Sequence, residues 1–351
     1  MENFPTQAER KQVDLLMYID SCPRLIDHKP VGYVLASVND LMNDRREFDL
    51  KKAEDPSKKD SVGKKAETIG KFRFLQCSEE QDPTFLDYIQ GGCQINLHIA
   101  VDFTMSNGDP NLPESLHYKG RPGSEFMNDY EHAILAVGRI LLDYDSDKKV
   151  PLYGFGGKLP DKKISHCWPL NGNEQDPSCN GLEEIFRAYR LALENVDLAA
   201  PTNFAPTVNR LVAEVHEEKK NARHTNKQSY HVLLLITDGA ITDMDSTIRA
   251  LIRASKLPIS IIIVGVGKAD FSNMHVLDGN VEPIEQDGDK AARDIVHFVE
   301  YRQFQDQRGD ARIVEQRLAK TVLTELPDQI VEYFRGKGIA PNRRAHNPTN
   351  P

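Results

Sequence analysis

Two near-continuous apolar segments constrain the fold of this 351-residue chain more than any other feature. They are YHVLLLIT at residues 230–237 and ISIIIVGV at 259–266, and a capped helical segment, TDMDSTIRALIRASK at 242–256, lies between them. Strands that are apolar on both faces are typical of parallel sheets covered by helices on both sides. These segments therefore predict two buried parallel strands separated by a helix.

Predicted strands and helices also alternate earlier in the chain, from near residue 90. Strands are predicted at 95–101 and 150–155, and amphipathic helices at 128–144, 181–196 and 206–220. Strands that alternate with helices predict an α/β fold, a doubly wound and mostly parallel sheet flanked by helices. In such sheets ligands bind beyond the carboxyl ends of the strands, beside a switch in strand order, so functional residues are expected directly after strands.

The first 89 residues follow a different pattern. Short segments at 32–42, 46–52 and 70–77 predict a small, partial antiparallel β module. The segment 51–71 carries seven Lys against four acidic residues, which predicts a solvated loop or linker, with attraction to an acidic phospholipid surface as the alternative. Residues 336–351 are rich in Pro and Asn without periodicity and predict a disordered tail.

Composition excludes several classes of protein. Forty-four Lys and Arg against 53 Asp and Glu give a net charge of −9, which disfavours an overall basic nucleic-acid binder. The five cysteines are scattered and never spaced as CxxC, so neither a disulfide framework nor a zinc ribbon is expected. The longest apolar segments are far shorter than the roughly 18–20 residues that cross a bilayer, and no signal peptide is recognised. We therefore expect a cytoplasmic protein.

Polar side chains follow two of the predicted strands. Asp102, Thr104 and Ser106 stand at alternate positions after the first strand. Asp238 follows a later strand, and Thr202 lies just before a predicted helix. Each fragment alone is typical of an ordinary loop, but together they can converge on one hard cation. Two carboxylates with neutral hydroxyls suit Mg²⁺ or Mn²⁺, whereas Ca²⁺ usually takes more carboxylate and carbonyl oxygens.

This Asp-x-Ser/Thr-x-Ser, Thr and Asp set resembles the metal-ion-dependent adhesion site of the von Willebrand factor A domain. The surrounding segments resemble the copine family and run in order from about residue 84 to 335: FLDYIQGGCQINLHIAVDFTMSNGDP, SLHY, NDYEHAILAVGRIL, YGFGGKLP, APTNFAPTVNRL, YHVLLLITDGAITDM, LPISIIIVGVG, LDGN, ARDIVHFVEYRQF and LPDQIVEYF. The resemblance implies a von Willebrand factor A-like domain at 83–335. It assigns the five metal positions to Asp102, Thr104, Ser106, Thr202 and Asp238. Thr104 replaces the commoner Ser and keeps the hydroxyl.

The resemblance also implies a domain order. Copines carry two C2 domains, which are calcium-dependent lipid-binding β-sandwiches, ahead of the A domain. Residues 27–82 are similar to the closing strands of the second C2 domain together with a basic linker, and a divergent N-terminus at 1–26 precedes them. The Asp-rich calcium loops are missing, with Asp27 as a lone candidate, so the case for Ca²⁺ is weak. We expect a truncated family member, a splice form or an incomplete gene model.

These observations predict a non-catalytic, copine-like protein that binds partners through the Mg²⁺ or Mn²⁺ site, where an Asp or Glu of an intracellular protein completes the metal's coordination. The resemblance adds calcium-dependent phospholipid binding, calcium-responsive signalling and peripheral association with the plasma membrane. The alternative is a metal-dependent hydrolase at the same site, which rests on fold analogy because no general base or GxSxG nucleophile is recognised. His98 is predicted to be a packing residue rather than a ligand.

Overall fold

The computed structural model describes residues 12–19, 29–37, 40–41, 43, 45–52, 67–75, 82–121, 123, 126–222, 225–279, 284–304 and 311–342. Their contacts divide the chain into two compact units, Met1–Asp82 and Pro83–Pro351, which are described separately.

The first unit contains an antiparallel sheet of order β1-β2-β3-β4. Its strands are β1 (Gln12–Ile19), β2 (Lys29–Ser37), β3 (Glu47–Lys52) and β4 (Thr68–Arg73). A small apolar cluster of Val34, Ala36, Phe48 and Leu50 lies on one face. The predicted antiparallel module is therefore confirmed. Strand β1 lies in the segment predicted as a divergent N-terminus, so that segment adds an edge strand, and residues 53–66 of the basic segment lie outside the described residues.

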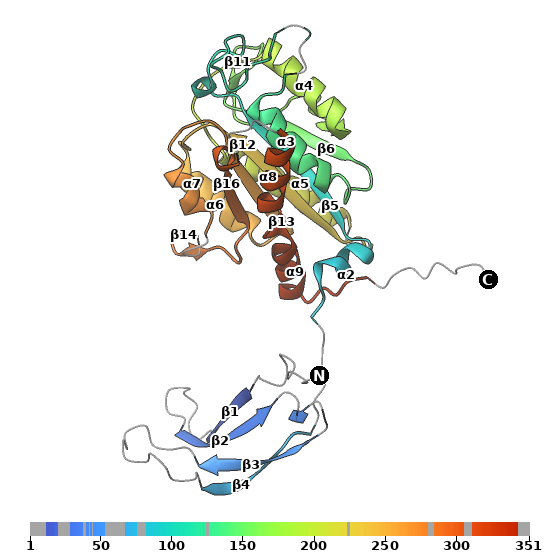
Figure 1. The fold of residues 1–351 in the computed structure, drawn as a ribbon, viewed down its shortest axis with the longest axis vertical. Coiled ribbons are helices and arrows are strands. Elements are labelled where there is room, and N and C mark those ends of the chain that lie inside the picture. The colour runs from blue at the N-terminus through green and yellow to red at the C-terminus, as the bar shows by residue number, and fades with distance from the viewer. Residues whose placement is uncertain are drawn as a thin grey trace, which may run out of the picture. The chain divides into compact units, whose positions relative to one another are not determined.

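The second unit is built on a sheet of order β10-β6-β5-β12-β13-β16 (Figure 1). Its parallel strands are β5 (Gln94–Asp102), β6 (Lys149–Phe155), β12 (Ser229–Thr237), β13 (Ile259–Gly265) and β16 (Val296–Glu300). Two short strands, β9 (Trp168–Pro169) and β10 (Ser178–Asn180), pair antiparallel with β6. The chain runs from β5 to β6 on one side and later to β12 on the other, so the strand order switches at β5. The predicted mostly parallel α/β sheet is confirmed.

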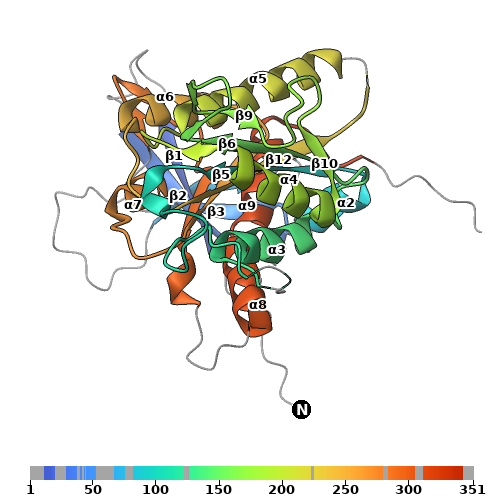
Figure 2. The same cartoon turned by 90° about the horizontal axis from the view of Figure 1, so that it is seen from above.

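Helices cover both faces of this sheet (Figure 2). They are α2 (Phe85–Gln90), α3 (Asp129–Leu141), α4 (Gly181–Asn195), α5 (Ala205–Asn221), α6 (Met244–Ala254), α7 (Ser272–Leu277), α8 (Ala311–Val322) and α9 (Leu326–Gly336). Alternate residues of β5 point to opposite faces, so Leu97 and Ile99 pack in the core with α3, α4 and α8, whereas Ala100 packs in the core with α5 and α6. No helix in the described part of the chain is long and apolar enough to cross a membrane.

The helix boundaries follow local signals in the sequence. Asn128 caps α3 by accepting a hydrogen bond from the backbone N–H of Glu131, whose carboxylate accepts from the backbone N–H of Asn128. Pro206 lies in the first turn of α5, where its missing N–H leaves no hydrogen bond unmade. The predicted helices at 128–144, 181–196 and 206–220 therefore begin within a residue of α3, α4 and α5.

The segment after α9 is ordered up to residue 342. The hydroxyl of Tyr88 donates to the carbonyl of Ile339 at 2.9 Å, and Gln228 Nε2 donates to the carbonyl of Ala340 at 2.7 Å. Asn342 Nδ2 donates to the carbonyl of Asn226 at 2.8 Å. The prediction of a disordered tail from residue 336 is therefore wrong for 337–342, because backbone carbonyls there bond to the domain. Residues 343–351 lie outside the described residues.

His98 on β5 gives the fold a testable pH dependence. Burial, together with the neighbouring His231 and against the opposing charge of Glu218, lowers its pKa from 6.5 to about 3. The unfolded chain takes up this proton near pH 6.5 and the folded chain does so near pH 3, so the free energy of unfolding should decrease as the pH falls through this window. Urea unfolding across this range should show a smaller decrease for His98→Asn than for the wild-type protein. Equal decreases in the free energy of unfolding for the two proteins would contradict the lowered pKa of His98 as the cause.

Candidate metal centre

Asp102 is the last residue of β5, and its carboxylate is fully buried. Oδ1 accepts hydrogen bonds from the backbone N–H of Thr104 at 2.8 Å and from Thr104 Oγ1 at 2.6 Å. Oδ2 accepts at 2.6 Å from Oγ1 of Thr237, which is the last residue of β12. The buried carboxylate therefore ties together the ends of two adjacent parallel strands at the switch in strand order.

A continuous series of oxygen atoms leads from Asp102 to Asp238. Thr104 Oγ1 lies 3.0 Å from Ser106 Oγ, and Ser106 Oγ donates to Asp238 Oδ1 at 2.9 Å. Asp102, Thr104 and Asp238 are buried, whereas Ser106 is exposed in the short 3-10 helix Met105–Asn107. The cluster therefore opens toward solvent at Ser106. Four of the five predicted metal ligands therefore lie in one series of oxygen–oxygen contacts.

Thr202, the fifth predicted ligand, is attached to the same region through backbone contacts. Its carbonyl accepts hydrogen bonds from the backbone N–H of Thr242 at 2.8 Å and from Thr242 Oγ1 at 2.6 Å. The carboxylate of Asp243 accepts from the backbone N–H groups of Phe204 and Ala205, both at 3.0 Å. The loop after Asp238 and the start of α5 are thus fixed to each other. The side chain of Thr202 is 8% exposed, and the described hydrogen bonds do not join it to the other four.

A second layer of polar contacts holds the Asp102 loop in place. His117 Nε2 lies 2.7 Å from the carbonyl of Asp102, and His117 Nδ1 lies 2.7 Å from the hydroxyl of Tyr189. Tyr130 stacks on the imidazole at 4.2 Å between ring centroids and donates its hydroxyl to Asn107 Oδ1 at 2.6 Å. Because a carbonyl can only accept, His117 carries its proton on Nε2 and accepts from Tyr189 at Nδ1. Burial lowers the pKa of His117 to about 3, which keeps the ring neutral.

Burial and hydrogen bonding have opposite effects on the pKa of each of the two carboxyl groups. Burial and then the charge of Asp238 raise the pKa of Asp102, hydrogen bonds from Thr104 and Thr237 lower it, and the net result is a pKa of about 7. Burial also raises the pKa of Asp238, and the hydrogen bond from Ser106 lowers it. The partners of both carboxylates in the described residues are hydroxyl and backbone N–H groups. Such a cluster can accept a cation as well as protons.

Sequence reasoning missed three residues that support the cluster. Thr237 is the last residue of β12 and lies within the quoted YHVLLLITDGAITDM segment, His117 lies in the quoted SLHY segment, and Gly156 follows β6. A Cβ atom at Gly156 would lie 2.3 Å from Thr104 Cγ2, and the residue has φ +75°. Only a glycine allows the backbone to pass Thr104 this closely.

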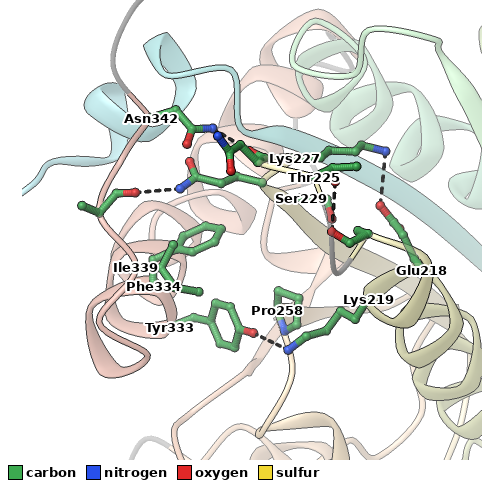
Figure 3. A pocket seen from close by; sticks show the side chains of 14 residues that line it. Glu218, Lys219, Thr225, Lys227, Ser229, Pro258, Tyr333, Phe334, Ile339 and Asn342 are labelled. Carbon is green, nitrogen blue, oxygen red and sulfur yellow. Dashed lines mark hydrogen bonds and ion pairs between the residues drawn. The ribbon is translucent and has the colours of Figure 1, made fainter.

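A separate pocket of about 370 Å³ lies at the other end of the domain, beside the start of β12 (Figure 3). Lys219 donates there to the hydroxyl of Tyr333 at 3.0 Å, and Lys227 pairs with Glu218 at 3.2 Å. None of the five predicted metal ligands lines this pocket. The two sites lie at opposite ends of β12.

The parallel sheet with an oxygen-rich cluster at its switch point defines a doubly wound α/β protein. A family model described as Copine matches residues 115–342, which is more than half of the chain. The chain belongs to the copine family, and the predicted family resemblance is confirmed.

Solved structures with low sequence identity also match the chain. The manganese-loaded TRAP protein of Plasmodium vivax is 13% identical, with 60% of this chain and 70% of that chain covered and a TM-score of 0.36. The SpRpn10 VWA domain is 11% identical, with 59% and 87% covered and a TM-score of 0.36. Proximal thread matrix protein 1 from the mussel byssus, with a zinc-occupied MIDAS motif, is 13% identical, with 66% and 46% covered and a TM-score of 0.33.

Gly156→Ala tests the close contact with Thr104, and Gly172→Ala is its matched control. Both glycines have positive φ, at +75° and +74°, but a Cβ at Gly172 would meet open space. The control should cost about 1–2 kcal/mol of stability for the left-handed backbone. Gly156→Ala should add about 1–3 kcal/mol for the overpacked contact. Urea unfolding measures both values, and equal losses would contradict the contact.

Proposed function

We propose that this copine-family protein binds partner proteins through a divalent metal ion held by Asp102, Thr104, Ser106, Thr202 and Asp238. An Asp or Glu side chain of the partner would complete the coordination of the metal. The observation that carries the proposal is the continuous series of oxygen atoms, each about 3 Å or less from the next, that joins the ends of β5 and β12. The bound metal would supply an electrophilic position that favours a carboxylate over neutral groups.

The spacing of these oxygen atoms supports a small divalent ion. Mg²⁺ takes six oxygens at about 2.0–2.1 Å, so neighbouring ligand atoms are about 3 Å apart. Thr104 Oγ1 and Ser106 Oγ are 3.0 Å apart, and Ser106 Oγ and Asp238 Oδ1 are 2.9 Å apart. The hydroxyl protons of Thr104 and Ser106, which are donated to the two carboxylates, would reorient toward solvent or protein once a cation is present. We propose Mg²⁺ or Mn²⁺, since two carboxylates with hydroxyls suit these ions better than Ca²⁺.

The exposed side of the cluster supports a role in binding a partner. Ser106 is exposed, and the neighbouring Met105 is 63% exposed on the same short helix. Asp102 lies beneath them and is fully buried. A metal held between these layers would be anchored from below and open to an incoming carboxylate from above.

A binding role without catalysis is favoured by the state of the nearest imidazole. His117 is the histidine that contacts Asp102 among the described residues, and both of its ring nitrogens already have partners. A general base needs a free nitrogen within reach of the attacking water. His117 therefore holds the loop in position and is poorly placed to accept a proton.

Asp102→Ala should abolish metal binding. Loss of a partner that merely orients a ligand typically costs 10–100-fold in affinity, so loss of this carboxylate should cost more than about 100-fold. Isothermal titration with Mn²⁺ measures the effect. Asp109→Ala is the matched control, because Asp109 lies in the same loop, is exposed and bonds to Asn111, and this variant should bind Mn²⁺ like the wild-type protein.

The partner's carboxylate can be tested with peptides selected from a random library on the Mn²⁺-loaded protein. Selected peptides should contain an Asp or Glu whose replacement by Asn or Gln abolishes binding, and EDTA should release them. Peptides that bind equally well without metal would contradict the proposal. Metal-dependent turnover of a phosphoester that is lost in Asp102→Ala would favour a hydrolase instead.

Binding to acidic phospholipid through the basic segment 51–71 is the second part of the proposal, and calcium-dependent phospholipid binding at the plasma membrane, which the family resemblance implies, is its alternative. In the described part of the first unit, two exposed carboxylates on or near the sheet pair with basic side chains. Asp40 pairs with Arg45 at 3.1 Å, and Glu47 pairs with Lys71. A Ca²⁺ site takes about 6–8 oxygen ligands, and these two carboxylates each face a basic side chain instead. Asp27 and residues 53–66 lie outside the described residues.

Sedimentation with vesicles that contain phosphatidylserine tests this second part. We expect binding through the basic segment to decrease as salt increases, because salt screens its charge, and to change little between Ca²⁺ and EGTA, because Asp40 and Glu47 each face a basic side chain. Vesicles of neutral lipid provide the control. A strong requirement for Ca²⁺ would show that calcium ligands exist elsewhere in the chain.

A further inference from the structure

Two buried histidines lie side by side beneath α5, away from the predicted metal ligands. His98 on β5 and His231 on β12 are 5% and 4% exposed, and their Nε2 and Nδ1 atoms are 3.1 Å apart in a hydrogen bond. The two ring nitrogens outside this hydrogen bond, His98 Nδ1 and His231 Nε2, are called the outer nitrogens. Each of them faces an acidic residue on α5. Glu218 Oε2 lies 3.0 Å from His231 Nε2, and Glu214 Oε2 lies 3.7 Å from His98 Nδ1.

The hydrogen bond between the two rings limits how many protons the pair can bind. A hydrogen bond between two imidazoles needs one proton between the rings. If both rings are neutral, the ring that donates this proton has an unprotonated outer nitrogen, which then faces a carboxylate. One added proton removes this repulsion, because each outer nitrogen then carries a hydrogen toward a carboxylate. A second added proton would leave two N–H groups opposed across 3.1 Å with no acceptor.

The surrounding charges favour a single positive charge on the pair. Glu214 also accepts from Tyr153 and Arg210, at 2.6 and 2.7 Å, and Glu218 also pairs with Lys227. The contact with His231 holds the pKa of Glu218 at about 2, so this carboxylate stays ionised. The two carboxylates face the ring nitrogens directly, whereas Arg210 and Lys227 contact the carboxylates, so the charged groups nearest the pair in the described residues are negative.

We propose that His98 and His231 form a proton-binding site that holds one shared proton at neutral pH and thereby fixes helix α5 to the sheet. Glu214 and Glu218 are four residues apart on α5, so they lie on one face of the helix above two neighbouring strands. Glu218 and Lys227 also line the pocket beside the start of β12 (Figure 3), which gives the proton a route to solvent. Helix α5 begins three residues after Thr202, so the proton strengthens the attachment of the helix that follows this residue.

Nitrogen chemical shifts of the histidine rings test the proposal in the unmodified chain. At pH 7.5, one ring of the pair should show two protonated nitrogens and the other should show one. His98→Asn and His231→Asn assign the signals, and the exposed His216 on the same helix is the reference. If both rings were neutral and titrated together with His216, the proposal would be overturned.

Charge removal on α5 provides a second test. Glu218→Gln should lower the pH at which the shared proton is lost by about one unit, a tenfold loss of proton affinity. Glu217→Gln is the matched control, because Glu217 pairs with Lys220 on the exposed face and should leave that pH unchanged. Equal effects of the two variants would contradict a local site.

Hydrogen exchange tests whether the proton fixes the helix. Amides of α5 between Val208 and Val215 should exchange faster once the shared proton is lost, after correction for the intrinsic effect of pH. Amides of α6 serve as the internal control and should show no such change. A loss of the proton without faster exchange in α5 would show that the proton does not hold the helix. None of these measurements needs the metal, so their outcome is independent of the proposed function.

Discussion

The burial of the Asp102 carboxylate at the end of β5 is the constraint on which this site depends. A charged group removed from water destabilises a fold unless hydrogen bonds or an opposite charge compensate it. Here the compensation comes from Thr104 on the following loop and from Thr237 on the adjacent strand. Because both oxygens of the carboxylate have partners, the loop and the two strand ends adopt one mutual arrangement. That arrangement places Ser106 beside Asp238.

Around Asp102, the residues that hold the loop in position differ from the residue that is open to a ligand. His117 and Tyr130 lie beneath the loop, are buried, and use their polar atoms on the backbone and on Asn107. Ser106 lies above and is exposed. Groups that are fully bonded and buried fix geometry, whereas an exposed oxygen can exchange its partner for a ligand. The physical basis for a binding site is therefore this difference in burial within one short loop.

Helix α5 connects two polar clusters of the domain. Its first turn is bonded to Asp243 in the loop after Asp238, and its later turns place Glu214 and Glu218 above the buried histidines. Apolar side chains on one face of α5 pack in the core of the domain. Polar contacts at both ends define its position, because each requires particular atoms to meet.

The sequence by itself determined the α/β class, the positions of the main strands and helices, and the five oxygen ligands we propose. Apolar strands and amphipathic helices carry these features locally, and carboxyl ends of parallel strands must meet at one edge. Tertiary structure decided what no local pattern contains. It paired His98 with His231, placed Gly156 against Thr104, and bonded residues 337–342 to the domain. These contacts join residues far apart in the chain, so they depend on how the layers pack.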